Sequence, residues 1–198
     1  MKQKLILIGA STGGPGHLKK LLTGITLPSN ASIIIAQHMS RNFVGSFASR
    51  LSQELNSAVE LLNNKVTLKN KIYICEQNSI ILNSQILTAN IDQSGIVTTY
   101  NPNVNMLFKS AVPLCKIADV MGILLTGIGD DGASGLNELY KAGAKCIAEN
   151  EQSAIVYGMP KRAKDINPNL EIANLDMIRT NLQRFIVWVN LSAAIAIF

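Results

Sequence analysis

Apolar residues in this chain gather in short continuous runs, which alternate with stretches of helical periodicity. The continuous runs predict buried strands at 4–9, 32–36, 120–125 and 144–148. Apolar residues spaced three and four apart predict helices at about 15–24, 42–55, 104–117, 133–142 and 175–193, the last capped by Asn174. Buried strands alternating with helices are typical of parallel sheets covered on both faces. The pattern therefore predicts an α/β fold with a doubly wound, mostly parallel sheet in a Rossmann-like three-layer arrangement.

The middle third of the chain has a different pattern. Short β-prone pieces, separated by Asn, Ser and Gly, occur there at 58–62, 71–75, 79–82, 86–89 and 96–99. Short strands broken by turn residues favour hairpins. We expect a small β-hairpin insertion in the α/β pattern.

Size and composition indicate one domain over 1–198, with a C-terminal helix and apolar tail at about 175–198. Hydrophobic residues make up 47% of the chain and charged residues 16%, which disfavours disorder. The apolar stretch 185–198 is shorter than the roughly 20 residues that span a bilayer. We expect this tail to pack on the domain or on a partner. With no signal-peptide pattern and no transmembrane segment, the sequence predicts a cytoplasmic protein.

Charge and cysteine usage narrow the classes of ligand. The net charge is +5, which favours an acidic partner. The basic pairs Lys19-Lys20 and Lys161-Arg162 are isolated and lack interleaved aromatic residues, so nucleic acid is not an expected partner. Three widely spaced cysteines without a C-x-x-C motif, and two histidines in all, argue against a disulfide framework and a metal site. We also expect no cofactor.

A candidate nucleophile follows the first predicted strand. Residues 9–13 fit the pattern G-x-S-x-G with Ser11 at its centre, between a strand and a helix. Small flanking residues allow a sharp turn that exposes the serine hydroxyl. The N–H of Thr12 would then lie at a helix N-terminus, where partial positive charge favours an oxyanion.

The same loop has two other interpretations. A dinucleotide-binding loop is disfavoured because the glycines at 9, 13, 14 and 16 do not form G-x-G-x-x-G, and no acidic residue ends the second strand. A Walker loop is excluded by the missing G-K-[ST]. A purely structural tight turn remains open on the local motif alone.

Candidates for a base and its orienting acid follow two other strands. His17 lies inside the helix after Ser11 and should project away from the turn. His38 directly follows the second strand, so it shares the carboxyl edge of the sheet with Ser11. Asp130 and Asp131 both follow the strand at 120–125. Either one could orient an imidazole or simply cap the next helix, and position alone does not choose between them.

Taken together, these segments resemble the catalytic domain of the chemotaxis protein-glutamate methylesterases, the CheB family. The resemblance covers about 4–165 in the right order. The matching stretches are Gly9–Pro15, Gln37–Met39, Leu125–Ala133, Ala148–Gln152, Tyr157–Pro160 and the P-x-V-x-x-L-F pattern at 102–108.

The resemblance implies a serine hydrolase with Ser11 as nucleophile and His38 as base. The family pattern T-G-M-G-x-D-G selects Asp131 over Asp130 as the acid. The backbone N–H of Ile128, which stands at the Met of that pattern, would form the oxyanion hole with Thr12. Family members demethylate glutamate methyl esters on the cytoplasmic domains of chemoreceptors, and many deamidate glutamines there. The receptor surface is acidic, in keeping with the basic charge of this chain.

Several departures and rivals accompany this resemblance. The chain starts at the catalytic strand, so we expect a stand-alone domain without the usual receiver domain. The family's A-P-G-x-x-H-like segment reads Ile74–Asn78 and its P-S-V-D reads Pro102–Asn105, which could alter substrate fit or local packing. Residues 157–161 spell the Y-x-x-x-K of short-chain oxidoreductases, but Pro160 would spoil the helix that this motif needs. A non-catalytic scaffold is the remaining alternative.

Overall fold

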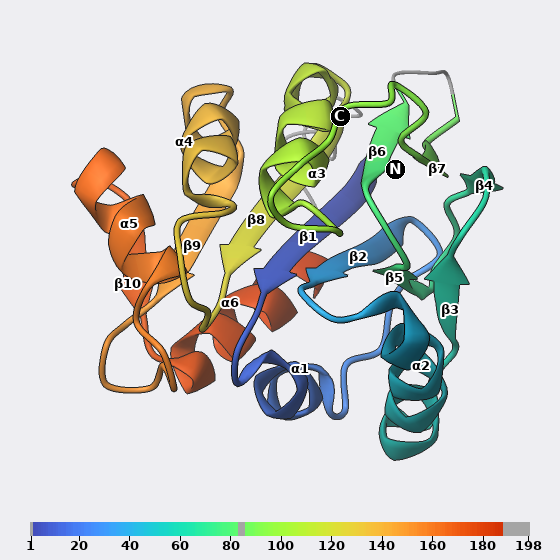
Figure 1. Cartoon of the computed structure of the whole chain (residues 1–198), viewed down its shortest axis with the longest axis horizontal. Coiled ribbons are helices and arrows are strands. Elements are labelled where there is room, and N and C mark those ends of the chain that lie inside the picture. Colours follow the sequence, from blue (N-terminus) through green and yellow to red (C-terminus); the bar gives the residue numbers. More distant parts are fainter. Residues whose placement is uncertain (1, 83–85, 188–198) are drawn as a thin grey trace, which may run out of the picture.

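The centre of the molecule is a seven-stranded sheet with the strand order β10-β9-β8-β1-β2-β5-β3 (Figure 1). The computed structural model describes residues 2–82 and 86–187. All pairs in this sheet are parallel. Its strands are β1 (Gln3–Ala10), β2 (Ala31–Gln37), β3 (Val59–Leu62), β5 (Ile72–Cys75), β8 (Ala118–Leu124), β9 (Lys145–Glu149) and β10 (Glu171–Ala173). After β1 the chain adds β2 on one side of that strand, and it later adds β8 on the other side. The direction in which strands are added therefore reverses at β1, and sheets of this kind bind ligands at such a reversal.

Helices cover both faces of this sheet. They are α1 (Gly14–Leu22), α2 (Arg41–Leu55), α3 (Val104–Ser110), α4 (Ala133–Lys141), α5 (Met159–Ile166) and α6 (Leu175–Val187). In β1, Leu5 and Leu7 belong to the core under α3 and α4, while Ile6 and Ile8 face α1, α2 and α6. Side chains alternate between faces along a strand, so one apolar run supplies both cores. The predicted three-layer, mostly parallel α/β fold is confirmed (Figure 1).

The middle third supplies a second, antiparallel sheet and also extends the first. Strands β4 (Val66–Thr67), β6 (Ser79–Leu82) and β7 (Thr88–Ile91) form the small sheet in the order β4-β7-β6. The segments expected at 58–62 and 71–75 are not hairpin strands, because they pair in parallel with the main sheet as β3 and β5. The prediction of a strand at 96–99 is wrong. Ile96 and Val97 are 61% and 96% exposed there and pair with no strand among the described residues.

The helix predictions differ from the structure mainly at their ends. The helix expected at 104–117 stops at Ser110, and a 3₁₀ turn at Val112–Lys116 replaces its second half. Pro113 inside that turn has no N–H to continue an α-helix. The predicted cap is confirmed, since the Met177 N–H donates to Asn174 Oδ1 at 2.8 Å. The end of the helix expected at 175–193 and the apolar tail lie outside the described residues. The helices within 2–82 and 86–187 are all too short or too polar to cross a membrane.

Candidate active site

Ser11 lies on the tight turn between β1 and α1. Its N–H donates to the Thr126 carbonyl at 3.0 Å, and its carbonyl accepts the Gly14 N–H at 2.9 Å, where the helix begins. Gly13 has φ +84°, a conformation that side chains rarely adopt. The G-x-S-x-G motif therefore has the strand–turn–helix setting that its chemistry requires. The Ser11 residue is only 7% exposed, so the turn places it at the edge of the sheet without exposing it as the motif predicts.

His38 follows β2, the neighbour of β1, at the same carboxyl edge. The His38 N–H donates to the Ala10 carbonyl at 2.9 Å. The amide of Gln37 donates to the carbonyls of Ser11 and His38, both at 2.9 Å. These bonds tie the nucleophile turn to the segment that carries the imidazole.

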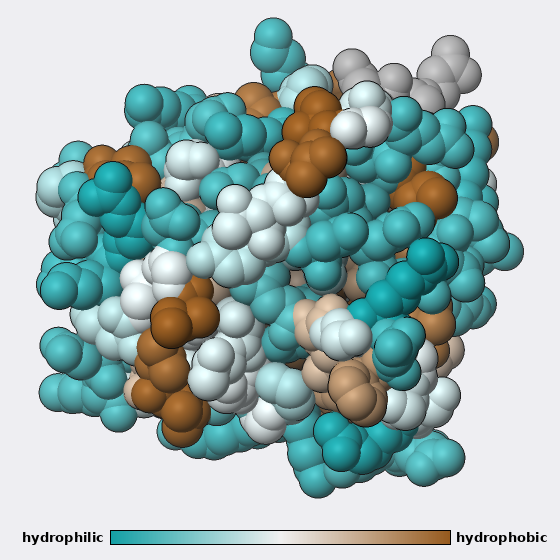
Figure 2. All heavy atoms as spheres, in the orientation of Figure 1, coloured by the Kyte–Doolittle hydropathy of each residue, from teal (hydrophilic) through white to brown (hydrophobic). Residues whose placement is uncertain are grey.

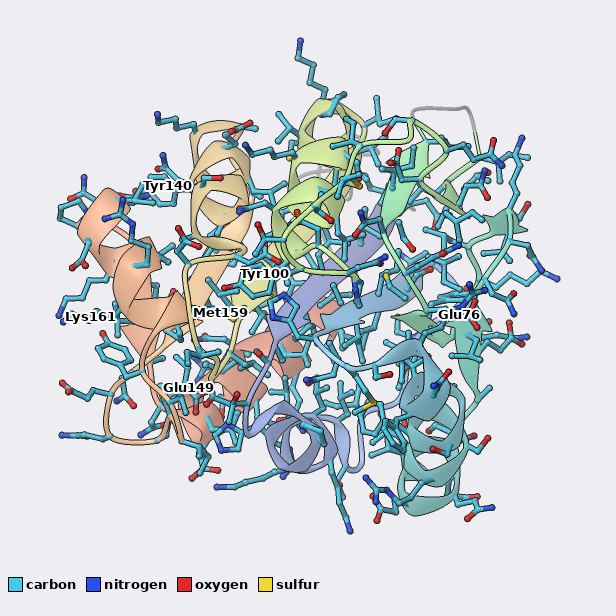
Figure 3. All side chains as sticks on the ribbon, viewed as in Figure 1. Glu76, Tyr100, Tyr140, Glu149, Met159 and Lys161 are labelled. Carbon is cyan, nitrogen blue, oxygen red and sulfur yellow. The ribbon has the colours of Figure 1, made fainter. Side chains whose placement is uncertain are left out.

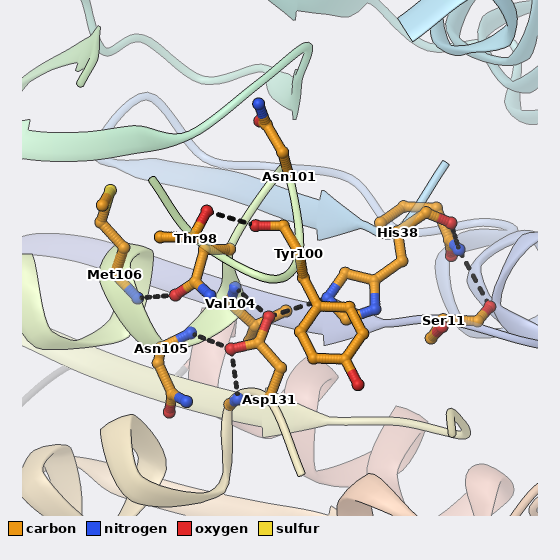
Figure 4. Close-up of polar contacts among 12 residues, drawn as sticks. Ser11, His38, Thr98, Tyr100, Asn101, Val104, Asn105, Met106 and Asp131 are labelled. Atoms are coloured by element: carbon orange, nitrogen blue, oxygen red, sulfur yellow. Dashed lines mark hydrogen bonds and ion pairs between the residues drawn. The ribbon is translucent and has the colours of Figure 1, made fainter. Parts of the chain in front are cut away.

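The carboxylate of Asp131 is 1% exposed and surrounded by donors (Figure 4). Its Oδ2 lies 2.8 Å from His38 Nε2 and accepts the Val104 N–H at 2.7 Å. Its Oδ1 accepts the N–H groups of Asn105 and Gly132, both at 2.9 Å. Such a set of donors stabilises the charged form and fixes its direction. Asp130 is exposed and lies outside this arrangement, so the geometry favours Asp131 as the partner of His38.

The His38 ring lies between Asp131 and Ser11 in the close-up (Figure 4). A carboxylate only accepts, so Nε2 carries the ring hydrogen and Nδ1 keeps a lone pair. Nδ1 is buried and has no partner within the described residues. Among the described residues, no hydrogen bond joins the Ser11 hydroxyl to the His38 ring. Apo sites often have loose nucleophile–base contacts, which tighten when substrate binds.

The two backbone donors expected at an oxyanion hole are free of protein acceptors. The N–H groups of Thr12 and Ile128 donate to no protein atom in the described residues, and both residues are exposed. The loop bearing Ile128 lies against Ser11. A Cβ added to Gly127 would stand 2.7 Å from Ser11 Cβ and 2.2 Å from Met159 Sδ. Only glycine permits this close approach of backbone to Ser11.

Tyr100 is a part of the site that the sequence did not reveal. Its ring stacks on the His38 imidazole, with centroids 4.5 Å apart and an interplanar angle of 3°. It directly follows the segment 96–99 expected to be a strand, and no motif marks it. Asn78 holds this segment, since its side chain donates to Thr98 Oγ1 and accepts the Asn103 N–H, both at 2.8 Å.

The two asparagines that depart from the family's P-S-V-D pattern have local structural roles. Asn103 caps α3 by accepting the Met106 N–H at 2.7 Å. Asn105 Oδ1 accepts the Gly135 N–H at 2.8 Å in the first turn of α4. Both changes are accommodated by packing around Asp131, and the carboxylate keeps its donors.

Other chemistries find less support in the described residues. Burial raises the pKa of the Cys75 and Cys146 thiols to about 12, so neither forms a thiolate at neutral pH. Burial also raises the pKa of Tyr157, which precedes α5 rather than sharing a helix with Lys161. The Y-x-x-x-K interpretation therefore fails on geometry. No group of three His, Cys, Asp or Glu within the described ranges could hold a metal ion.

The surface around the site is mostly hydrophilic, with apolar side chains in small separate groups (Figure 2). Ile128 and Ile155 are 62% and 66% exposed, although both belong to segments beside the nucleophile turn. His17, the second histidine, points instead toward β9, where its Nδ1 lies 3.2 Å from Glu149 Oε2. It is therefore paired with Glu149, and not with Ser11 or Asp131, among the described residues.

Comparison with known proteins decides the family. The family model described as CheB methylesterase matches residues 6–182. The chain belongs to the CheB methylesterase family. The crystal structure of the Thermotoga maritima CheB methylesterase catalytic domain superposes with a TM-score of 0.81 and 25% sequence identity, covering 93% of this chain and 99% of that one.

Curated family relatives share more sequence. A protein-glutamate methylesterase/protein-glutamine glutaminase of Caldanaerobacter subterraneus is 36% identical over 82% of this chain and 46% of its own length. A protein of the same name, numbered 2, from Syntrophus aciditrophicus is 37% identical over 92% of this chain and 54% of its own. The chain thus spans about half the length of these CheB relatives.

Proposed function

We propose that this protein is a cytoplasmic serine esterase, which hydrolyses glutamate methyl esters on the cytoplasmic domains of bacterial chemoreceptors. The observation that carries the proposal is the His38–Asp131 pair beside Ser11 at one edge of the sheet. Family membership and the names of the relatives supply the substrate class. The net charge of +5 suits an acidic receptor surface. In this proposal residues 1–198 form one catalytic domain.

The first half-reaction transfers the glutamyl group to the enzyme. Ser11 Oγ attacks the ester carbonyl carbon, and its proton passes to His38 Nδ1. Asp131 stabilises the resulting imidazolium through Nε2–H. The oxyanion accepts the N–H groups of Thr12 and Ile128. Collapse of the tetrahedral species breaks the bond to the methoxy group, which takes the proton from Nδ1 and leaves as methanol.

The second half-reaction returns the enzyme to its starting state. Water attacks the glutamyl ester on Ser11 and gives a proton to His38 Nδ1. The second tetrahedral species collapses, Ser11 Oγ regains that proton, and the receptor carries a free glutamate. A glutamine side chain follows the same course with ammonia as the leaving group. The double name of the relatives supports this second activity.

Replacing the nucleophile tests the proposal. We expect Ser11→Ala to lower kcat for methanol release from methylated receptor by about 10⁴-fold or more, because no other group attacks the carbonyl. Mass spectrometry of receptor peptides would show the methyl ester, or the glutamine, unchanged. Receptor binding and the unfolding transition should stay close to those of the unchanged protein. Full activity of the Ser11→Ala variant would refute the mechanism, and an inactive unchanged protein would favour the scaffold alternative.

A further inference from the structure

The carboxylate of Glu149, at the carboxyl end of β9, is fully buried and has no part in the mechanism above (Figure 3). Its Oε2 accepts the Thr126 N–H at 2.8 Å and lies 3.2 Å from His17 Nδ1. Its Oε1 accepts the Ser153 hydroxyl at 2.7 Å. A charged group in the interior is costly unless donors surround it, so these contacts must be maintained for the group to stay there.

Thr126 links this carboxylate to the nucleophile turn. It is 0% exposed, and its carbonyl accepts the Ser11 N–H at 3.0 Å. Its hydroxyl donates to the Thr12 carbonyl at 2.8 Å and accepts the Val156 N–H at 2.9 Å. Its own N–H is the group that Glu149 accepts. One residue thus connects the end of β9 to both Ser11 and Thr12.

The oxyanion-hole loop begins directly after Thr126. The Gly127 N–H donates to the Val156 carbonyl at 3.0 Å, and the Gly127 carbonyl accepts the Met159 N–H at 2.9 Å. These bonds fix the peptide planes on either side of Gly127. The direction of the next N–H, that of Ile128, is therefore set by a network that Glu149 anchors at Thr126.

His17 connects the same carboxylate to α1. Because a carboxylate only accepts, the tautomer with hydrogen on Nδ1 fits this contact. His17 lies in the helix that begins at the nucleophile turn, so its ring holds Glu149 between α1 and β9. Its side chain is 13% exposed.

We propose that Glu149, oriented by His17, is a positioning residue for ester hydrolysis: by holding Thr126 it sets the oxyanion-hole N–H of Ile128 relative to Ser11. Neither side chain touches substrate in this scheme. The inference rests on the proposed function, because it assigns a role within the same reaction. The feature of Glu149 that matters in this role is the oxygen that accepts the Thr126 N–H.

Paired substitutions at Glu149 test this role. Glu149→Leu keeps the approximate size and removes the acceptor, whereas Glu149→Gln keeps an acceptor. The probe is an alkyl fluorophosphonate, which phosphonylates the serine and places a phosphoryl oxygen in the oxyanion hole. We expect Glu149→Leu to lower both the rate of Ser11 phosphonylation and kcat for the receptor ester by about 10- to 100-fold with little change in KM, because a misplaced donor costs this much. Glu149→Gln should restore most of both rates.

Ser32→Ala is the matched control, because it removes a buried hydrogen bond far from the site. The Ser32 hydroxyl donates to the Lys69 carbonyl at 2.7 Å, and the residue is 3% exposed at the start of β2. It should lower stability and leave both rates unchanged. An equal loss in Ser32→Ala, or a Gln variant as slow as the Leu variant, would overturn the proposal.

Two further outcomes keep the proposal separate from folding defects and from the proposed function. If Glu149→Leu does not fold, His17→Leu removes the ring that orients the Glu149 carboxylate and leaves the carboxylate in place, and unchanged phosphonylation in that variant overturns the inference. Unchanged phosphonylation in a folded Glu149→Leu variant also overturns it. Failure of the proposed function is recognised independently, since Ser11 of the unchanged protein would then resist the probe or the receptor ester would persist.

Discussion

Two pairs of histidine and carboxylate lie along the carboxyl edge of the sheet, and we propose a catalytic role for only one of them. The His38–Asp131 contact measures 2.8 Å and the His17–Glu149 contact 3.2 Å. Their carboxylates are 1% and 0% exposed, and their imidazole side chains 11% and 13%. Burial and pairing alone therefore do not separate them.

The pairs differ in which ring nitrogen the carboxylate occupies and in what surrounds the carboxylate. Asp131 contacts Nε2 of His38 and accepts three backbone N–H groups. Nδ1 of His38 is left buried beside Ser11, with no hydrogen-bond partner among the described residues. Glu149 takes Nδ1 and accepts one backbone N–H, that of Thr126. The comparison supports the proposal that an unpaired ring nitrogen beside Ser11, rather than the histidine–carboxylate pair itself, distinguishes His38 as the base.

The largest effect on kcat is expected when the His38–Asp131 pair is broken. In Asp131→Asn, an amide oxygen at the Oδ1 position can keep the N–H groups of Asn105 and Gly132, while the NH₂ at the Oδ2 position faces the His38 ring and leaves the Val104 N–H without its acceptor. The ring must then accept at Nε2 and carry hydrogen on Nδ1, so it can no longer take the proton of Ser11. We expect kcat for methanol release to fall by about 10⁴-fold. Steady-state kinetics with methylated receptor would measure this loss.

Asp130→Asn is the control for this substitution. Asp130 is the exposed neighbour that the sequence alone could not exclude as the acid. It should keep nearly full activity. Equal losses in the two variants would mean that the loop, and not the carboxylate of Asp131, limits the reaction.

A smaller effect on kcat is expected from removing the aromatic ring that stacks on His38, since His17 lacks such a contact in the described residues. Tyr100 stacks on His38, and among the described residues His17 has no such ring contact. Stacked aromatic pairs contribute about 0.5–1.5 kcal/mol, so Tyr100→Leu should lower kcat by about 2- to 10-fold. Tyr100→Phe keeps the stack and should keep the rate. If Phe is as slow as Leu, the phenol hydroxyl near Gly129, and not the stack, is the group that matters.

Much of the fold follows from local pattern, and the exceptions are residues whose partners are distant. The apolar run at 4–9 predicted β1 because both faces of a central strand are buried. The same reasoning could not tell that 58–62 and 71–75 join the main sheet, since pairing is not written in local periodicity. Residues 96–99 have β-prone side chains but pair with no strand in 2–82 or 86–187, so propensity alone gave a wrong prediction. Strand β10, with three half-buried residues, gave no pattern at all.

The site divides in the same way. Ser11, His38 and Asp131 follow strands that are neighbours in the sheet, so strand ends and one family resemblance were enough to propose them together. The contact between His17 and Glu149 joins residues 132 positions apart, from a helix and a strand. The placement of Tyr100 depends on a loop held by Asn78. Such contacts depend on packing between elements, and the sequence contains no periodic signal for them.

The smallest expected effect comes from an exposed pair near the second buried one. Lys20 on α1 and Asp176 on α6 form an ion pair of 3.0 Å with side chains 57% and 72% exposed. Water and salt screen such a pair, so its coupling energy should be below about 1 kcal/mol. Asp176 also lies in the first turn of α6, where a negative charge is favourable, so a single substitution would overstate the coupling energy of the pair.

Urea unfolding of Lys20→Gln, Asp176→Asn and the double variant isolates the coupling energy between the two side chains, and kcat should not change. A coupling near the roughly 3 kcal/mol lost on breaking buried pairs would contradict this expectation. It would also show that burial is not what distinguishes Glu149 and Asp131 from the charges on the surface.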